Sequence, residues 1–209
     1  MPKKFALRAH CRQDVCAPSL TWRVFCAVEL PAGILLRVTQ HIARLKEAVP
    51  EAHASWSRID NIHLTLKFLG DIPQALVQNL SQAASQAVAG LEPFTIRLED
   101  SGVFPSHGSP RVLWIGVNDP EGQLTKLQMR LEDEAERLGF QREARTFHPH
   151  ITFARLRKPR HARTLAAVHK ATLFEPAEVS VAELLVIRSE LSSAGSKYST
   201  ISRHRLARA

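Results

Sequence analysis

Apolar and polar residues along this chain follow two different periods, and the two kinds of segment alternate. Apolar residues at steps of three and four predict amphipathic helices over residues 35–49, 73–88 and 124–138, and another after Pro159. Seven shorter segments are typical of β-strands, several with strict alternation: residues 21–29, 63–68, 94–99, 111–117, 150–153, 179–187 and 197–203. A turn is expected at Gly70-Asp71, between the strand at 63–68 and the helix that opens at Pro73. The pattern predicts an α+β fold.

The order of these elements occurs twice. The offset is 150 − 63 = 87 residues between two equivalent histidines and 159 − 73 = 86 residues between two equivalent prolines. Two copies at so long a period indicate duplication of a βαβαβ unit. We therefore expect one bilobal domain over residues 21–209, with pseudo-two-fold lobes that share strands and correspond approximately to residues 21–105 and 106–209. Residues 1–20 stand outside the repeat and are expected to form an irregular extension.

Composition adds a bias toward anionic partners. The 209 residues carry 28 Lys and Arg against 20 Asp and Glu, a net charge of +8, which favours a polyanion such as RNA. No apolar run approaches the ~20 residues of a membrane-spanning helix. The cysteines, Cys11, Cys16 and Cys26, are odd in number. They fit a reduced cytoplasmic protein better than a disulfide framework.

The tripeptide pattern His-x-Thr occurs at residues 63–65 and again at residues 150–152. Side chains two apart on a strand share a face, so His63 lies beside Thr65, and His150 beside Thr152. A pseudo-two-fold axis would point both pairs into one cleft. Together they would supply an acid, a base and two hydroxyl donors, which is a metal-free site for cleaving a phosphoester.

Other residues near the motifs are open to two interpretations. Arg155, three residues after Thr152, could clamp a phosphate with its fork of N–H donors, or could belong to a basic surface cluster. Lys67 falls on the His63 face of the alternating pattern, where a solvated lysine is expected. Phe25 and Trp56 are candidates for stacking on a nucleobase, with core packing as the alternative.

Signatures of other phosphate and metal chemistries are missing. The sequence has no Walker loop, no GxGxxG fingerprint and no GxSxG elbow. Cys11 and Cys16 are not followed by a second ligand pair at zinc-finger spacing. No metal and no cofactor are therefore expected.

At these motifs the sequence resembles the two-histidine phosphoesterase superfamily, and within it the RNA 2′,3′-cyclic phosphodiesterases, also called 2′-5′ RNA ligases. The segments that carry the resemblance are RVFCAVELP, NIHLTLKFLG, VFPSHGSPRVLWIGV, FHPHITFAR and IRSELSSAGSKYSTI. The resemblance implies a bilobal α+β fold in which antiparallel sheets form a cleft. It also implies that His63 donates a proton, His150 accepts one, and Thr65, Thr152 and Arg155 bind the phosphate. The first copy has Phe68 where the second has Arg155, which excludes a symmetric arginine pair.

The expected activity is hydrolysis of RNA 2′,3′-cyclic phosphate ends to 2′-phosphomonoesters, with ATP-independent 2′-5′ ligation as the reverse reaction. The expected partner is RNA or an oligonucleotide with a cyclic phosphate end, tRNA fragments among the candidates, and the protein is expected to be a monomer. Two alternatives stay open. One is a non-catalytic protein that binds RNA or tRNA through the same cleft, and the other is a phosphodiesterase of small cyclic nucleotides.

Overall fold

A computed structural model describes residues 20–157, 161–193 and 195–207. The helices are α1 (Ala32–Ala48), α2 (Val77–Val88), α3 (Gln123–Arg137) and α4 (Ala162–Ala171), with short 3-10 turns at Ile59–Asn61 and Gln74–Leu76. The strands are β1 (Thr21–Glu29), β2 (Ala54–Trp56), β3 (His63–Pro73), β4 (Phe94–Phe104), β5 (Val112–Asn118), β6 (His150–Leu156), β7 (Ala177–Val181), β8 (Glu183–Ser192) and β9 (Gly195–Arg205). The extension predicted for residues 1–20 lies outside the described residues except for Leu20, and so do Cys11 and Cys16.

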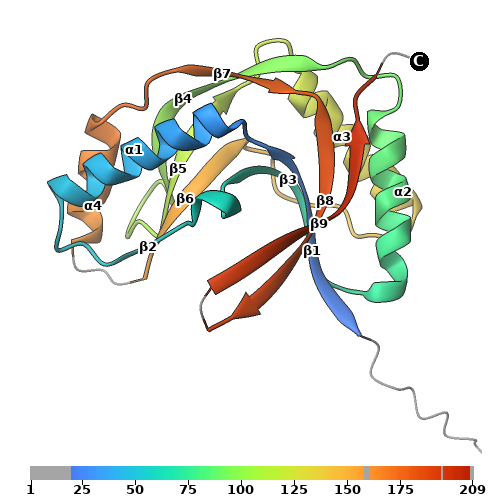
Figure 1. The fold of residues 1–209 in the computed structure, drawn as a ribbon, viewed down its shortest axis with the longest axis horizontal. Coiled ribbons are helices and arrows are strands. Elements are labelled where there is room, and N and C mark those ends of the chain that lie inside the picture. The colour runs from blue at the N-terminus through green and yellow to red at the C-terminus, as the bar shows by residue number, and fades with distance from the viewer. Residues whose placement is uncertain (1–19, 158–160, 194, 208–209) are drawn as a thin grey trace, which may run out of the picture.

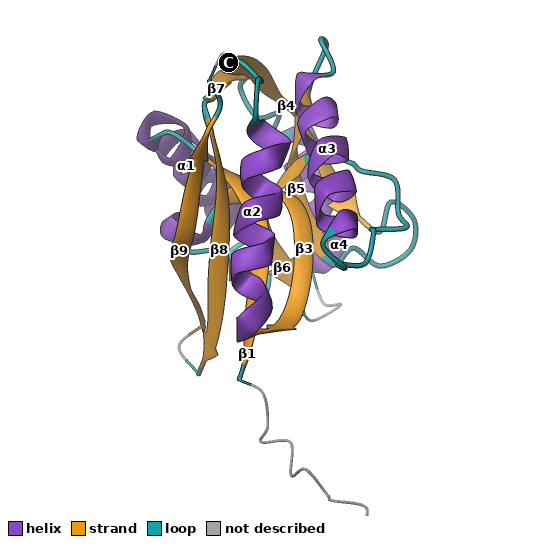
Figure 2. Cartoon of the chain, turned by 90° about the vertical axis from the view of Figure 1, so that its right-hand side faces the viewer, coloured by secondary structure: helices purple, strands orange, loops and turns teal. Residues whose placement is uncertain are grey.

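The strands form two antiparallel sheets, which confirms the α+β class. The first sheet has the order β3-β1-β8-β9 and the second the order β2-β6-β5-β4-β7. Each sheet takes strands from both sequence halves, because β8 pairs with β1 and β4 pairs with β5. Each sheet is also covered by one helix from each sequence half: α2 and α3 lie over the first sheet, and α1 and α4 lie over the second (Figures 1 and 2).

The helices cover the outer faces of the sheets and bury one large apolar core. Leu64 of β3, Leu80 of α2, Ile151 of β6 and Leu165 of α4 are all 0% exposed within it. A second, small apolar cluster of Phe25, Ala27, Leu185 and Ile187 covers the opposite face of the first sheet. The first sheet thus has apolar packing on both faces, which supports β3, the strand that carries His63 and Thr65.

Two element boundaries differ from the sequence prediction. The expected turn at Gly70-Asp71 is wrong, since β3 continues to Pro73 and α2 starts only at Val77. Gly70 adopts a φ of +70° inside the strand. The glycine therefore allows an irregularity in the pairing of β3 with β1 and does not form a turn that reverses the chain. The single strand predicted over residues 179–187 is two strands, β7 and β8, in different sheets. Apolar residues continue across the break at Ala182, and periodicity does not report which sheet a strand joins.

Candidate functional site

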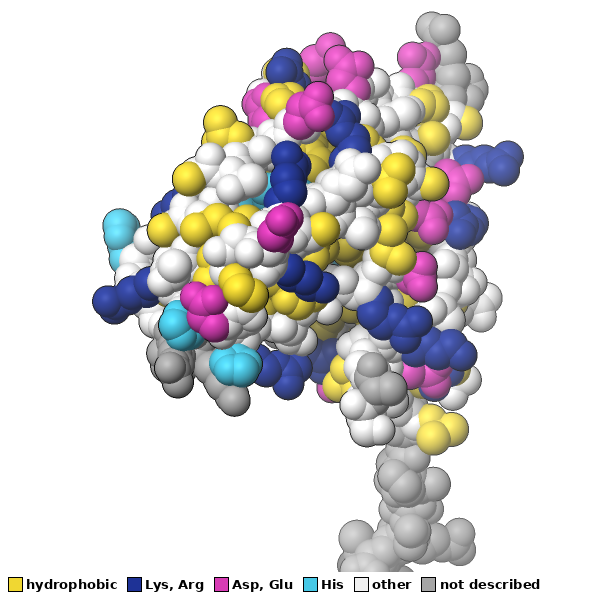
Figure 3. Space-filling view, turned by 60° about the vertical axis from the view of Figure 1, so that its left-hand side comes forward, with side chains coloured by type: hydrophobic (Ala, Val, Ile, Leu, Met, Phe, Trp, Pro, Cys, Tyr) yellow, Lys and Arg dark blue, Asp and Glu magenta, His cyan; other side chains and the backbone are white. Residues whose placement is uncertain are grey.

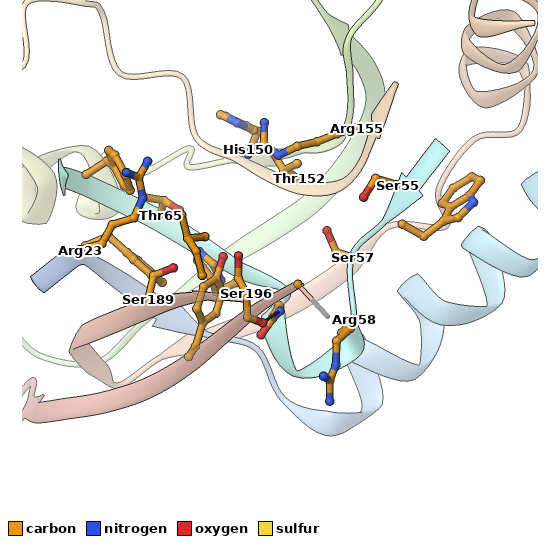
Figure 4. Close-up of a pocket in the computed structure, with 18 of the residues that line it drawn as sticks. Arg23, Ser55, Ser57, Arg58, Thr65, His150, Thr152, Arg155, Ser189 and Ser196 are labelled. Atoms are coloured by element: carbon orange, nitrogen blue, oxygen red, sulfur yellow. Dashed lines mark hydrogen bonds between the residues drawn. The ribbon is translucent and has the colours of Figure 1, made fainter. Parts of the chain in front are cut away.

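A cavity of about 670 Å³ opens between the two sheets. His63 and Thr65 reach it from β3 in the first sheet, and His150 and Thr152 reach it from β6 in the second. Figure 4 shows Thr65, His150 and Thr152 among the residues that line it. Each motif opens its strand, and the two strands, β3 and β6, contact each other. Arg155, Phe25 and Trp56 also line the cavity, so all seven candidate residues meet in one place.

Both motif strands carry a β-bulge directly after the threonine. In β3, Thr65 pairs with Ala27 and Lys67 with Cys26, so that Leu66 has no partner. In β6, Phe153 is the unpaired residue, between Thr152 and Ala154. A bulge places one extra residue in the strand and inverts the alternation of faces beyond it.

The bulges decide which side chains reach the cavity. Strict alternation would turn the third residue after each threonine away from it. The inversion instead brings Phe68 and Arg155 to the cavity, where both are exposed, Phe68 by 52%. The two residues occupy equivalent places in the two copies, one with an uncharged ring and the other with a guanidinium.

The same bulge buries Lys67, and the expectation of a solvated lysine on the His63 face is therefore wrong. Its Nζ donates to Glu132 Oε2 at 2.5 Å and to the Gln141 carbonyl oxygen at 2.8 Å, and the two side chains of the ion pair are 2% and 4% exposed. Glu132 also accepts from the backbone N–H of Glu143 at 3.2 Å. The pair thus ties the His63 strand to the segment that leads toward His150.

The ring of His150 is oriented by its neighbours. Nδ1 lies 2.6 Å from the carbonyl oxygen of His148, and because a carbonyl only accepts, Nδ1 carries a proton and Nε2 of the neutral ring has a free lone pair. The rings of Phe104 and Trp114 pack around it at 4.9 and 6.2 Å between centroids. Burial lowers the pKa of His150, the hydrogen bond to the His148 carbonyl opposes that shift, and the neighbouring His148 and Arg155 side chains lower the pKa further.

His63 has a matching environment in the other sheet. Its ring stacks on Phe25 at 4.6 Å and meets Tyr198 edge-on at 5.4 Å. Burial lowers its pKa to about 4, and a hydrogen bond to the backbone of Asn61 opposes that shift. Both imidazoles are therefore neutral at pH 7 in the empty site. An anionic ligand between them favours the charged form of either ring.

Neither aromatic residue chosen for base stacking has a free ring. Phe25 is 3% exposed, and its stacking partner is His63, so its role is to support that imidazole. The Trp56 ring packs parallel to Phe153 at 6.3 Å, with Lys46 Nζ 5.4 Å from its centroid. These contacts are the packing named as the alternative interpretation, and Trp56, which is half-buried, also lines the cavity.

The cavity is strongly basic. Four arginines line it and, among the described residues, no Asp or Glu does: the arginines are Arg23, Arg58, Arg155 and Arg157. On the face drawn in Figure 3, by contrast, Lys and Arg are interspersed with Asp and Glu. The positive lining is thus a local property that suits an anionic ligand.

Several contacts of the site could not be identified from the motifs alone. Phe104 and Trp114 belong to the segment VFPSHGSPRVLWIGV. The resemblance of this segment to a known family was the only indication in the sequence that these two residues lie near the site. Trp114 lies flat on Gly102, where an added Cβ would fall 2.0 Å from the indole. The glycine thus makes room for the ring that packs against His150.

Two kinds of feature are absent from the part of the chain that the structure describes. No group of three or more His, Cys, Asp or Glu side chains is arranged there to hold a metal ion. Within the same residues, none of the helices has the length and apolar character needed to span a membrane.

Comparison with known proteins gives a consistent answer. The model of the 2′-5′ RNA ligase superfamily matches residues 36–192. A Methanothermobacter thermautotrophicus protein named RNA 2′,3′-cyclic phosphodiesterase is 33% identical over 187 residues, which cover 88% of this chain and 98% of the relative. A protein of the same name from Escherichia coli is 36% identical over 134 residues, or 64% of this chain and 71% of the relative.

Solved structures agree on the fold. The apo crystal structure of E. coli LigT superposes with a TM-score of 0.70 at 29% identity, covering 90% of this chain and 99% of that one. The fold, the paired motifs and the length of the match confirm the family expected from the sequence. The chain belongs to the 2′-5′ RNA ligase superfamily.

Proposed function

We propose that this enzyme hydrolyses 2′,3′-cyclic phosphodiester ends of RNA to 2′-phosphomonoesters by acid–base catalysis between two histidines, without a metal. The observation that carries the proposal is the presence of two His–Thr pairs, one from each sheet, in a single arginine-lined cavity. The relatives named RNA 2′,3′-cyclic phosphodiesterase support the same substrate class.

In the proposed reaction His150 is the base. Its Nε2 takes a proton from water, because Nδ1 is already committed to the His148 carbonyl. The water oxygen forms a bond to phosphorus while the bond from phosphorus to the ribose 3′ oxygen breaks. His63, protonated, gives its proton to that 3′ oxygen. Exchange of protons with solvent restores the starting state.

Thr65, Thr152 and Arg155 are proposed to hold the non-bridging oxygens. Hydroxyl and guanidinium donors aimed at those oxygens stabilise the charge that builds up on the phosphorane-like transition state. The bound anion also raises the pKa of the imidazoles above their lowered values in the empty site. Substrate binding therefore helps to protonate His63, which is otherwise neutral at pH 7.

The same ring opening, with a 5′-hydroxyl RNA end in place of water as the nucleophile, would form a 2′-5′ linkage without ATP. tRNA fragments with cyclic phosphate ends are proposed as substrates, and a cytoplasmic monomer as the form that acts on them. A crystal structure of E. coli LigT with 3′-AMP supports a nucleotide-sized ligand for the cavity.

The test is turnover of adenosine 2′,3′-cyclic phosphate and of an oligonucleotide ending in a cyclic phosphate, with the product identified by phosphorus NMR. We expect the 2′-phosphate, and we expect His63→Ala and His150→Ala each to lower kcat by about 10²–10⁴-fold. Near-wild-type turnover in folded His150→Ala would exclude this mechanism. Binding of the oligonucleotide without turnover would favour a non-catalytic RNA-binding protein, and turnover of the mononucleotide alone a phosphodiesterase of small cyclic nucleotides. A 3′-phosphate product would reverse the assigned orientation of the ribose.

A further inference from the structure

The first sheet carries a second group of ligand-type side chains beyond the histidines. Arg23 of β1 pairs in register with Ser189 of β8, and Ser189 pairs with Tyr198 of β9. Residues directly opposite on antiparallel strands share a face, with Cβ atoms ~5 Å apart. All three line the cavity. They therefore form one row across its floor.

Phe68 adjoins this row. The guanidinium carbon of Arg23 lies 4.8 Å from the centroid of the Phe68 ring, and that ring is 52% exposed. The other aromatic rings of the cavity are less exposed: Phe25 is buried, and Trp56 and Tyr198 are half-buried. Phe68 thus offers the most accessible aromatic surface of the cavity, with a cation beside it.

The position of Phe68 relative to the catalytic pair follows from the repeat. Phe68 and Arg155 are each the third residue after a motif threonine, beyond equivalent bulges. Arg155 lines the same cavity as the two histidines and is the proposed phosphate ligand. By the pseudo-two-fold relation we infer that Phe68 lies on the other side of a phosphate bound there, where a ring can meet the attached nucleoside.

Arg23 is available to a ligand. Its partner Asp71 is 3.4 Å away, and the two side chains are 36% and 62% exposed. A solvent-exposed pair of this kind is weak and exchanges readily. A phosphodiester offers a guanidinium a better, forked acceptor.

We propose that Arg23 and Ser189 bind the 5′-phosphodiester of the terminal nucleotide while its base stacks on Phe68, so that the enzyme selects the end of a chain over a free nucleoside cyclic phosphate. This inference rests on the proposed function. The opposite end of the cavity, with Ser55, Ser57 and Arg58, is the alternative place for the chain (Figure 4). It is disfavoured because its ring, Trp56, is occupied by Phe153 and Lys46.

The experiment compares kcat/KM for adenosine 2′,3′-cyclic phosphate with and without a 5′-phosphate, and for the dinucleotide with the same end. Arg23→Met keeps an apolar cover over Phe68 and removes the charge. It should lower kcat/KM about 10-fold or more on the two substrates that carry the extra phosphate. Its kcat on the bare cyclic nucleotide should stay unchanged. Arg58→Met is the matched control and should keep the wild-type preference.

Phe68→Ala should raise KM on all three substrates, roughly 5- to 100-fold, and Phe68→Trp should restore it. The proposed subsite would be refuted if Arg23→Met still had a higher kcat/KM on the substrates with the extra phosphate, or if Arg58→Met lost that preference. Equal losses on all three substrates in Arg23→Met would do the same. A wild-type enzyme inactive on all three would instead overturn the proposed function, so the two failures are distinguishable.

Discussion

The buried Lys67–Glu132 pair is the place in this fold where removal of one charge should be most damaging. Lys67→Met keeps the length of the side chain but deletes the two hydrogen bonds that Nζ donates. The Glu132 carboxylate, 4% exposed, would keep only its bonds from Gln128 and from the backbone of Glu143. An uncompensated buried charge destabilises a protein by about 3–5 kcal/mol.

Urea unfolding followed by circular dichroism measures this effect. With a slope of about 2 kcal/mol per M, the midpoint should fall by about 2 M while the slope stays constant. Lys126→Met is the matched control, because Lys126 is an exposed lysine of α3, and it should leave the midpoint close to that of the wild type. Glu132→Met in the Lys67→Met background should recover much of the loss, since a well-packed apolar pair can replace a buried ion pair.

Two outcomes would refute the reasoning. One is a Lys67→Met midpoint equal to that of Lys126→Met, which would mean that the pair is not buried in solution. The other is a double variant whose loss equals the sum of the single losses, which would mean that the two charges are not coupled.

Further predictions concern the site itself. Burial lowers the pKa of both His63 (to about 4) and His150 from 6.5, so the singly protonated free enzyme exists only below about pH 6.5. kcat/KM should be bell-shaped and fall as pH rises through that region, and a flat profile from pH 5 to 9 would contradict this. Gly102→Ala should displace Trp114 and lower kcat in a folded protein, and an unchanged kcat would show that the ring does not position His150. Activity should persist in excess EDTA, whereas loss restored by a divalent ion would reclassify the site. Arg155→Met should raise the pKa of His150 in an NMR titration and leave that of His63 in place.

The sequence was most informative where a pattern was repeated. Two copies of His-x-Thr at one offset predicted that the pairs would meet, and all four side chains line one cavity. Most strands and helices were also predicted with errors of a few residues at their ends, because their apolar periods are long enough to identify the element.

What could not be predicted depends on pairing between strands that are distant in the chain. The bulges at Leu66 and Phe153 exist only relative to β1 and β5, so strict alternation assigned Lys67 and Phe68 to the wrong faces. The exchange of β4 and β8 between sheets is invisible for the same reason. A hydrophobic period identifies a strand, but neither its neighbour nor its register.

A duplicated site supplies two equivalent imidazoles, whereas hydrolysis requires that they differ. Both rings are half-buried among aromatic neighbours and both bond to backbone. One difference between their surroundings is the third residue after each threonine. Arg155 places a lasting positive charge that disfavours protonation of His150, while Phe68 places no charge at the equivalent point beside His63. A bound phosphate raises the pKa of both rings, but the penalty from Arg155 acts on one alone. Burial, however, lowers the pKa of His63 to about 4, so Arg155 alone does not direct the proton to His63. The proposed roles therefore require that the bound phosphate raise the pKa of His63 more than that of His150, which an NMR titration of both imidazoles with phosphate bound would measure.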